Sequence, residues 1–276
     1  MSYFPPDFDE KQPVALLAGK GRYPYLIWQE MQKRCPNAFI ISFEPNEFLL
    51  QSAGSDKIYS ESIGQVGAWL KILKKKQARY AILAGQITPK KLFHGLNPDL
   101  KAVWLLAKLK ERNATTIFGT LINEIEKLNI TVLDARCFME SYVVAQGDMT
   151  PTYGQKVNEA ELRWAIDTCR GIADLNIGQS LVVSQGTVII TEAFDGTDAM
   201  IERAGSICNR PMGLVKLAKK YQDFRYDVPT FGMHTLEEMH KSGIVWVALE
   251  SGRTIILDKQ DVIAEAQRLK IRILGF

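Results

Sequence analysis

The chain has 276 residues, of which 46% are hydrophobic and 24% are charged. A chain of this length and composition forms a full hydrophobic core, leaves room for two domains and excludes a largely disordered protein. Its formal net charge of +3 at pH 7 is too small to indicate a nucleic-acid-binding protein.

The first half of the chain alternates apolar strands with helices. Predicted strands cover residues 14–18, 38–43, 80–84 and 130–133, and predicted helices cover residues 24–34, 62–76, 98–112 and 115–128. Such alternation predicts a parallel sheet with helices on both faces. The fold class is therefore α/β, with a Rossmann-like N-terminal domain over residues 1–145.

Clustered Gly, Pro and Thr residues at 146–152 break this periodicity and predict a linker. The rest of the chain predicts helices at 158–175, 197–207 and 260–269, a hairpin of 181–183 with 187–190, and strands at 212–217, 245–249, 254–257 and 271–274. A capping box, Thr235-x-x-Glu238, predicts a further short helix that ends at Gly243. We therefore expect a C-terminal mixed α/β domain over residues 146–276.

The cysteines and histidines are scattered, with no CxxC pair and no HExxH motif. This spacing indicates neither a zinc site nor a disulfide framework. The sequence contains no run of about 18 apolar residues that would cross a membrane and no signal peptide. We therefore expect a cytoplasmic protein with reduced thiols.

A glycine turn, Gly19-Lys20-Gly21, follows the first strand. Such a turn lets the backbone approach a phosphate at a helix N-terminus. The dinucleotide fingerprint is incomplete, because Pro24 stands where the third glycine would be, although Glu44 lies where an acid could bind a ribose. The alternative is a tight strand-to-helix turn with Pro24 in the first helical turn.

A second glycine turn begins at Gly85, again at the carboxyl end of a strand. Such edges form ligand crevices in open α/β sheets. Lys90, Lys91 and His94 follow, and they either face a phosphate or lie on the surface.

In the second domain, a strand runs into Glu192, Asp195, Gly196, Thr197 and Asp198 at the start of a helix. Backbone N–H groups there could hold an anion. Alternatively, the three carboxylates could surround a divalent cation, since hard cations take oxygen ligands. The simplest alternative is that Thr197 and Asp198 cap the helix and favour its dipole.

A charged stretch runs from Lys216 to Pro229. If it is extended, Asp223, Arg225 and Asp227 lie on one face, because side chains alternate along a strand. Pairing with the guanidinium would keep both acids ionised, and ionised acids bind Mg²⁺ or orient a water molecule. The alternative is a solvated charge cluster in a loop.

Four segments resemble the LpxI-type UDP-2,3-diacylglucosamine diphosphatases of Gram-negative lipid A synthesis. They are Leu17 through Pro24, Asp174 through Ser180, Glu192 through Met200, and Leu214 through Thr235. The resemblance extends over nearly the whole chain, and its C-terminal segments are highly specific together. Asp195 replaces the family's usual glutamate, and Lys220-Tyr221 replaces a usual Pro-Gly. A Gly-Asp pair that the family has near Thr115 is absent.

The resemblance implies a magnesium-dependent hydrolase that acts on a lipid-linked nucleotide sugar. Mn²⁺ is the alternative metal, because it also accepts oxygen ligands. The hydrolase would cleave the pyrophosphate of UDP-2,3-diacylglucosamine to UMP and 2,3-diacylglucosamine 1-phosphate (lipid X), with water attacking the α-phosphorus. The resemblance also implies a homodimer. Collecting a diacylated substrate would bring the protein into peripheral contact with the inner membrane.

The candidate site residues, taken from the motifs and the resemblance together, are expected to fall into three groups. The catalytic group is Asp223, Asp198 and Arg225. The metal ligands are Asp223, Asp227 and Glu192. The substrate-binding group is Gly19, Gly21, Gly85, Gln179, Thr197, Lys216, Lys219, Gln222 and Thr235.

Two other functions remain open. A nicotinamide-dependent oxidoreductase would use Gly19, Gly21 and Glu44, but it leaves the charges of the second domain unexplained. A non-enzymatic nucleotide-sugar binder would need cations more than the carboxylates that this sequence provides.

Overall fold

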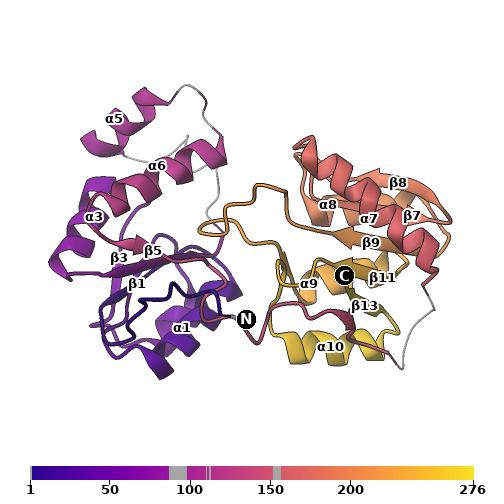
Figure 1. Cartoon of the computed structure of the whole chain (residues 1–276), viewed down its shortest axis with the longest axis horizontal. Coiled ribbons are helices and arrows are strands. Elements are labelled where there is room, and N and C mark those ends of the chain that lie inside the picture. Colours follow the sequence, from indigo (N-terminus) through magenta and orange to yellow (C-terminus); the bar gives the residue numbers. More distant parts are fainter. Residues whose placement is uncertain (1, 87–97, 110, 112, 152–156) are drawn as a thin grey trace. The chain divides into compact units, whose positions relative to one another are not determined.

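The computed structural model describes residues 2–86, 98–109, 111, 113–151 and 157–276 (Figure 1). The chain divides into two compact units. The N-terminal unit contains the residues up to Glu140 together with Phe224–Tyr226, and the C-terminal unit contains Ser141–Asp223 and Asp227–Phe276. The chain therefore returns to the N-terminal unit for three residues before the C-terminal unit is completed.

The N-terminal unit contains a five-stranded parallel sheet, which confirms the predicted Rossmann-like class. Its strands, in the spatial order β3-β2-β1-β4-β5, are β1 (Val14–Ala18), β2 (Phe39–Ser42), β3 (Ile58–Ser60), β4 (Tyr80–Ala84) and β5 (Thr131–Val132). From β1 the chain adds β2 and β3 on one side and then β4 and β5 on the other, so the strand order changes direction between β1 and β4. Because all the strands are parallel, their carboxyl ends lie at one edge of the sheet, where α/β folds bind ligands.

Helices cover both faces of this sheet. They are α1 (Arg22–Arg34), α2 (Glu47–Ser52), α3 (Val66–Lys75), α5 (Leu100–Lys108) and α6 (Ala114–Glu126). α1 contacts β1 and β4 and buries Leu26, Ile27, Trp28 and Met31. This apolar stripe has the spacing of a helix that packs on a sheet.

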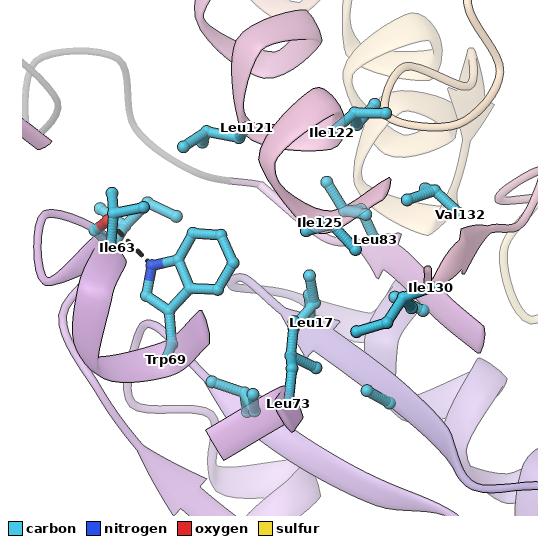
Figure 2. Packing of buried hydrophobic residues seen from close by; sticks show 14 of the residues in the cluster. Leu17, Ile63, Trp69, Leu73, Leu83, Leu121, Ile122, Ile125, Ile130 and Val132 are labelled. Atoms are coloured by element: carbon cyan, nitrogen blue, oxygen red, sulfur yellow. Dashed lines mark hydrogen bonds between the residues drawn. The ribbon is translucent and has the colours of Figure 1, made fainter. Parts of the chain in front are cut away.

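On the other face, α3 and α6 pack over the sheet (Figure 2). Trp69 from α3 and Ile125 from α6 are buried in one cluster with Leu17 of β1 and Leu83 of β4. The Trp69 indole Nε1 donates a hydrogen bond to the Ile63 carbonyl at 3.3 Å, as the dashed line in Figure 2 marks. The ring is therefore buried with its polar atom satisfied.

The C-terminal unit contains a six-stranded sheet with both parallel and antiparallel pairs, which confirms the predicted mixed α/β class. Its strands, in the spatial order β6-β13-β11-β9-β7-β8, are β6 (Gly147–Asp148), β7 (Ser180–Ser184), β8 (Thr187–Thr191), β9 (Met212–Lys216), β11 (Ile244–Leu249) and β13 (Arg272–Gly275). β9, β11 and β13 are parallel, whereas β6 and β7 run antiparallel to their neighbours. A separate parallel pair joins β10 (Thr230–Phe231) to β12 (Ile255–Ile256).

Among the described residues of the C-terminal unit, four helices cover the six-stranded sheet: α7 (Glu159–Asp174), α8 (Thr197–Ile207), α9 (Met233–Lys241) and α10 (Lys259–Arg268). Alternate strand residues point to opposite faces. Leu181 and Val183 of β7 pack in the cluster with α7, whereas Val182 and Leu214 pack in the cluster with α8, α9 and α10. The sheet is therefore buried on both sides.

The predicted linker at 146–152 is wrong in part, because Gly147–Asp148 forms the edge strand β6. Asp148 forms an ion pair with Arg272 of β13, and Thr150 Oγ1 accepts the Ile273 N–H at 2.9 Å. These partners lie more than a hundred residues away in sequence, so local composition did not reveal them. Among the helices of the described residues, none has the length and apolar character needed to cross a bilayer.

Candidate active site

The strand directions of the C-terminal unit bring three separated segments to one edge of the sheet. β7 is antiparallel to both β8 and β9, so the carboxyl ends of β8 and β9 lie beside the start of β7. Ser180 pairs directly with Lys216 in this register. Glu192 follows the end of β8, and its backbone N–H donates to the Ser180 carbonyl at 2.9 Å.

These segments build a hydrogen-bond network around Glu192, of which only 9% is exposed. Glu192 Oε2 accepts from Ser180 Oγ at 2.5 Å and from the Gln179 backbone N–H at 3.3 Å. Its Oε1 accepts from Thr197 Oγ1 at 2.8 Å, and Lys216 Nζ donates to that same hydroxyl oxygen at 3.1 Å. Because Lys216 is only 7% exposed, a buried cation and a buried carboxylate share one hydroxyl group. We call Ser180, Glu192, Thr197 and Lys216 the Glu192 network.

The predicted capping of α8 by Thr197 is wrong. The N-cap is Gly196, with a φ of 85° in the left-handed region that favours glycine, and no side chain caps the helix. The Thr197 hydroxyl is instead held by the Glu192 network. The first-turn N–H groups of this helix therefore lie beside a buried ammonium without a side-chain acceptor, which favours an anion there.

The two other acids of this segment have separate partners. Asp195 accepts from Arg203 NH1 at 2.8 Å, and this hydrogen bond lowers the pKa of Asp195 below its ordinary value. Asp198 accepts from Thr235 Oγ1 at 3.2 Å, and its Oδ2 lies 3.6 Å from His234 Nε2. Glu192, Asp195 and Asp198 therefore do not form the single cation-binding group that the spacing suggested.

The predicted capping box at Thr235 is also wrong. α9 begins at Met233, and its N-cap is Gly232, which makes no side-chain cap. Thr235 lies within the first turn of the helix, and its hydroxyl bonds to Asp198. Thr235 thus joins the surroundings of the α8 N-terminus through Asp198.

The loop after β9 is not extended between Asp223 and Asp227, contrary to the prediction. Residues 224–226 form a turn, closed by a hydrogen bond of 3.1 Å from the Asp227 N–H to the Asp223 carbonyl. Gln222 joins the two arms of the loop. Its Oε1 accepts from the Lys219 backbone N–H at 3.1 Å, and its Nε2 donates to the Asp227 carbonyl at 3.1 Å.

Lys219 is held at both its ends. Its Nζ donates to Asn176 Oδ1 at 2.6 Å, and its carbonyl accepts from Arg253 NH2 at 2.8 Å. Asn176 and Ser180 were not among the predicted site residues. Both lie in the segment from Asp174 to Ser180 that carries the family resemblance, which is the signal that could have identified them.

The surroundings of Asp227 connect the loop with the Glu192 network. Burial raises the pKa of Asp227 above its ordinary value, and the negative charge of Glu192 adds to the rise. The Gln222 hydrogen bond and the charges of Lys219 and Lys216 oppose it. The charges of Lys216, Lys219 and Glu192 thus all influence the ionisation of Asp227 within one region of the C-terminal unit.

Asp227→Asn is expected to stabilise the protein at pH 7. The pKa of Asp227 in the folded state lies above its unfolded value of about 3.9. Between these two pKa values the folded state binds more protons than the unfolded state does, so the stability of the wild type falls as the pH rises from the lower value to the higher one. Asparagine has no proton to lose. The melting temperature of the variant, measured by calorimetry, should therefore exceed that of the wild type by an amount that grows across this pH range.

Asp167→Asn, on the exposed face of α7, removes a charge outside this region and serves as the control. A wild type that is more stable than Asp227→Asn at pH 7 would show that the carboxylate form is the stabilised one.

The predicted metal ligands do not form a complete metal site as they are arranged. Within the part of the chain that the structure describes, no group of three or more His, Cys, Asp and Glu side chains could hold a metal ion. Both carboxylate oxygens of Glu192 already accept hydrogen bonds from O–H and N–H donors. Glu192 is better explained as the acceptor that fixes Thr197 and, through it, Lys216.

Gln179 presents an unsatisfied group at the same edge. Its side-chain Oε1 is buried and has no hydrogen-bond partner among the described residues. Its backbone is fixed, because its carbonyl accepts the Leu217 N–H at 3.0 Å. A buried acceptor without a donor is unfavourable, so a ligand N–H or O–H, or a water molecule, would complete this position.

Arg225 has a partner that the sequence did not anticipate. Its NH1 lies 2.9 Å from Glu126 Oε1, at the end of α6 in the N-terminal unit. The prediction placed this guanidinium between Asp223 and Asp227 on an extended segment. The structure has a turn at residues 224–226 instead. The Glu126 ion pair gives Arg225 a role in anchoring the turn.

The neighbours of Arg225 are anchored as well. The Tyr226 ring stacks on Phe118, with centroids 5.3 Å apart and an interplanar angle of 10°. The Phe224 carbonyl accepts the Ala135 N–H at 2.7 Å, and the Phe224 ring centroid lies 3.7 Å from the guanidinium carbon of Arg136. Phe224, Arg225 and Tyr226, which link Asp223 to Asp227, are therefore each held by contacts of their own.

Three of the thiols are unsuited to nucleophilic chemistry. Burial raises the pKa of Cys35 to about 11 and that of Cys169 to about 12, and it also raises the pKa of Cys137. These thiols are protonated at neutral pH, and a protonated thiol is a poor nucleophile.

Packing explains two of the three predicted ligand-binding glycines in the N-terminal unit. A Cβ at Gly85 would lie 2.5 Å from Pro24 Cγ, and one at Gly19 would lie 2.6 Å from the Gln86 carbonyl oxygen. Gly21 shares a positive φ with Gly85 (95° and 91°), but it differs from both in that the space around its Cβ position is open. A ligand contact at this turn thus has room at Gly21. Lys90, Lys91 and His94 lie outside the described residues.

A cavity of about 590 Å³ opens at the carboxyl ends of β2 and β3 in the N-terminal unit. Its polar lining residues are Ser42, Glu44, Asn46, Ser60, Glu61 and Ser62. Asn46 connects the cavity with the first glycine turn, because its Nδ2 donates to the Gly21 carbonyl at 3.0 Å. A buried acid after β2, next to a glycine turn after β1, is the arrangement with which Rossmann-like folds bind a ribose.

Comparisons with known proteins cover both units. The LpxI N-terminal domain model matches residues 13–142, and the LpxI C-terminal domain model matches residues 145–274. A curated relative, the UDP-2,3-diacylglucosamine pyrophosphatase LpxI of Caulobacter vibrioides, is 29% identical over 224 residues, which cover 77% of this chain and 80% of that protein. The two domain models together span nearly the whole sequence, and the chain therefore belongs to the LpxI family.

Proposed function

We propose that this protein hydrolyses the pyrophosphate bond of UDP-2,3-diacylglucosamine in lipid A biosynthesis. A water oxygen attacks the α-phosphorus, and the bond from that phosphorus to the bridging oxygen breaks. The products are UMP and 2,3-diacylglucosamine 1-phosphate, and the proton of the attacking water passes to a base or to solvent. The activity named for the Caulobacter relative supports this choice of substrate.

The observation that carries the proposal is the buried ammonium group of Lys216, the last residue of β9, which bonds to Thr197 at the N-terminus of α8. A buried ammonium, a helix N-terminus and the Thr197 hydroxyl together suit the oxygens of a phosphate group. Lys219, fixed by Asn176, adds a second cation to the same region. These groups would neutralise the charge that develops on the pyrophosphate during hydrolysis.

The acids at the ends of the anchored turn supply the remaining role. We propose that Asp223 orients the attacking water, and that Gln222 and Asp227 fix the loop on which it lies. Asp198 and Arg225 stay proposed catalytic residues, each with a structural partner, Thr235 and Glu126 respectively. The requirement for Mg²⁺ or Mn²⁺ also stays a prediction.

The function is tested by measuring UMP release from UDP-2,3-diacylglucosamine in ¹⁸O-labelled water, with Mg²⁺ or Mn²⁺ and then with EDTA. Metal-dependent release with the label in UMP is the expected result. Label in the sugar phosphate would move the attack to the other phosphorus. Tight UDP-sugar binding without release would favour the non-enzymatic binder, and NAD(H) binding would favour the oxidoreductase.

A smaller effect is expected at the cavity in the N-terminal unit. Glu44→Gln should weaken uridine binding about tenfold, because a carboxylate accepts hydrogen bonds from ribose hydroxyls more strongly than an amide does. Titration calorimetry with uridine measures this change, and 2′-deoxyuridine should bind the wild type and the variant more equally. Glu61→Gln, which also lines this cavity, is the control. Equal uridine affinity of wild type and Glu44→Gln would show that this cavity does not bind the ribose.

A further inference from the structure

Helix α5 presents an apolar face that the rest of the described chain leaves exposed. Leu100, Val103 and Trp104 follow helical spacing, and 90%, 50% and 47% of their respective surfaces are accessible. The opposite face is anchored, because Ala102 and Leu105 are buried in the cluster shared with α3 and α6. Figure 1 shows α5 at the margin of the N-terminal unit, beyond α6. The helix is thus fixed on its inner side and apolar on its outer side.

Two lysines flank this face. Lys108 Nζ lies 3.3 Å and Lys101 Nζ lies 5.0 Å from the Trp104 ring centroid. Lys101 also pairs with Glu124 at 2.5 Å, whereas the described residues provide Lys108 with no carboxylate partner. Aliphatic residues, a tryptophan and lysines with long apolar stems are the composition of helices that lie in the headgroup region of a membrane.

We propose that the outer face of α5, formed by Leu100, Val103, Trp104 and Lys108, docks on the surface of a bilayer that contains anionic lipids. The proposal rests on the proposed function, since a diacylated substrate resides in a membrane. The lysines complement the negative charge of such a surface. They argue against a second copy of the chain as the occupant, because the centres of protein–protein interfaces are depleted in lysine.

The test compares the full chain with the double variant Val103→Glu/Trp104→Glu by sedimentation with vesicles. One vesicle contains phosphatidylethanolamine and phosphatidylglycerol, and the other contains phosphatidylcholine alone. We expect the wild type to prefer the anionic vesicle and the double variant to lose binding by at least about tenfold. Both substitutions lie at exposed positions, and an unchanged melting temperature confirms the fold. Ile207→Glu, at a 63% exposed position on α8, is the matched control and should bind normally.

Lys108→Gln is expected to lower binding to the anionic vesicle about fivefold and to leave binding to phosphatidylcholine unchanged. The proposal is overturned if the wild type binds neither vesicle, or if the double variant binds as the wild type does. It is also overturned if the double variant converts a wild-type dimer into a monomer while vesicle binding persists, which would make α5 a self-association surface.

Hydrolysis assays separate this proposal from the proposed function. The double variant should hydrolyse detergent-dispersed UDP-2,3-diacylglucosamine at the wild-type rate and vesicle-embedded substrate about tenfold more slowly. Vesicle binding by a wild type that hydrolyses neither form would end the proposed function and retain the docking surface. Normal hydrolysis of vesicle-embedded substrate by the double variant would overturn the docking surface alone.

Discussion

Asp223→Ala should lower the turnover of UDP-2,3-diacylglucosamine by about 100-fold or more, while the protein stays folded. The turn that contains Asp223 is closed through its backbone carbonyl, which alanine retains. The side chain, in contrast, is the proposed group that orients the attacking water. Its loss should remove about 2.7 kcal/mol of transition-state stabilisation, so that kcat and kcat/KM fall together in steady-state assays of UMP release.

Two further variants make this prediction specific. Asp223→Asn keeps the shape of the side chain and removes its charge, so it should lose nearly as much activity. Asp167→Ala removes an exposed acid from α7 and should leave turnover unchanged. Near-wild-type turnover in Asp223→Ala would remove Asp223 from the mechanism, and a large fall in its melting temperature would assign it to the fold.

Glu192→Ala should destabilise the protein by about 3 kcal/mol and also lower kcat/KM. The substitution removes the acceptor of the Ser180 and Thr197 hydroxyl groups, and it leaves the buried Lys216 without its nearby negative charge. Breaking a buried polar network by removing one member leaves the other members unsatisfied. Calorimetry measures the stability change, and titration with UMP measures the expected loss of phosphate binding.

Partial removal of the network provides the control. Ser180→Ala removes one donor and should cost about 1 kcal/mol, with little effect on UMP binding. Thr197→Val removes the hydroxyl that connects Glu192 with Lys216, so it should weaken UMP binding although Glu192 is retained. If Glu192→Gln keeps wild-type stability and instead weakens activation by Mg²⁺, Glu192 is a metal ligand and not the acceptor that positions Lys216.

Most of the fold could be predicted because its elements have strong local signals. β1, β2 and β4 are continuous apolar runs, and α1, α3 and α7 have helical apolar periodicity. The short elements α2, β3, β6 and β10 escaped prediction. The three missed strands have two or three residues and lie outside continuous apolar runs, unlike the two-residue strands β5 and β12, which the sequence did reveal. The missed strands form because neighbouring strands of the sheets supply their hydrogen bonds.

The candidate site was predicted in composition but not in geometry. Glu192 and Asp227 were predicted as metal ligands and Thr197 and Lys216 as substrate-binding residues, and the structure brings these four residues into one region. The helix caps at Thr197 and Thr235 and the extended form of the Asp223 loop were wrong. In each of them a tertiary partner replaced the local interaction that the sequence favoured.

The sequence by itself determined the α/β class, the parallel and mixed sheets and the family, because apolar periodicity and characteristic motifs are local along the chain. Only the tertiary structure decided which polar groups meet. Antiparallel pairing of β7 with β8 and β9 places Ser180, Glu192 and Lys216 at one edge, and the return of Phe224–Tyr226 to the N-terminal unit anchors the turn between the two acids. The physical reason is that a side chain's partner is fixed by strand order and register, and these depend on packing between distant segments.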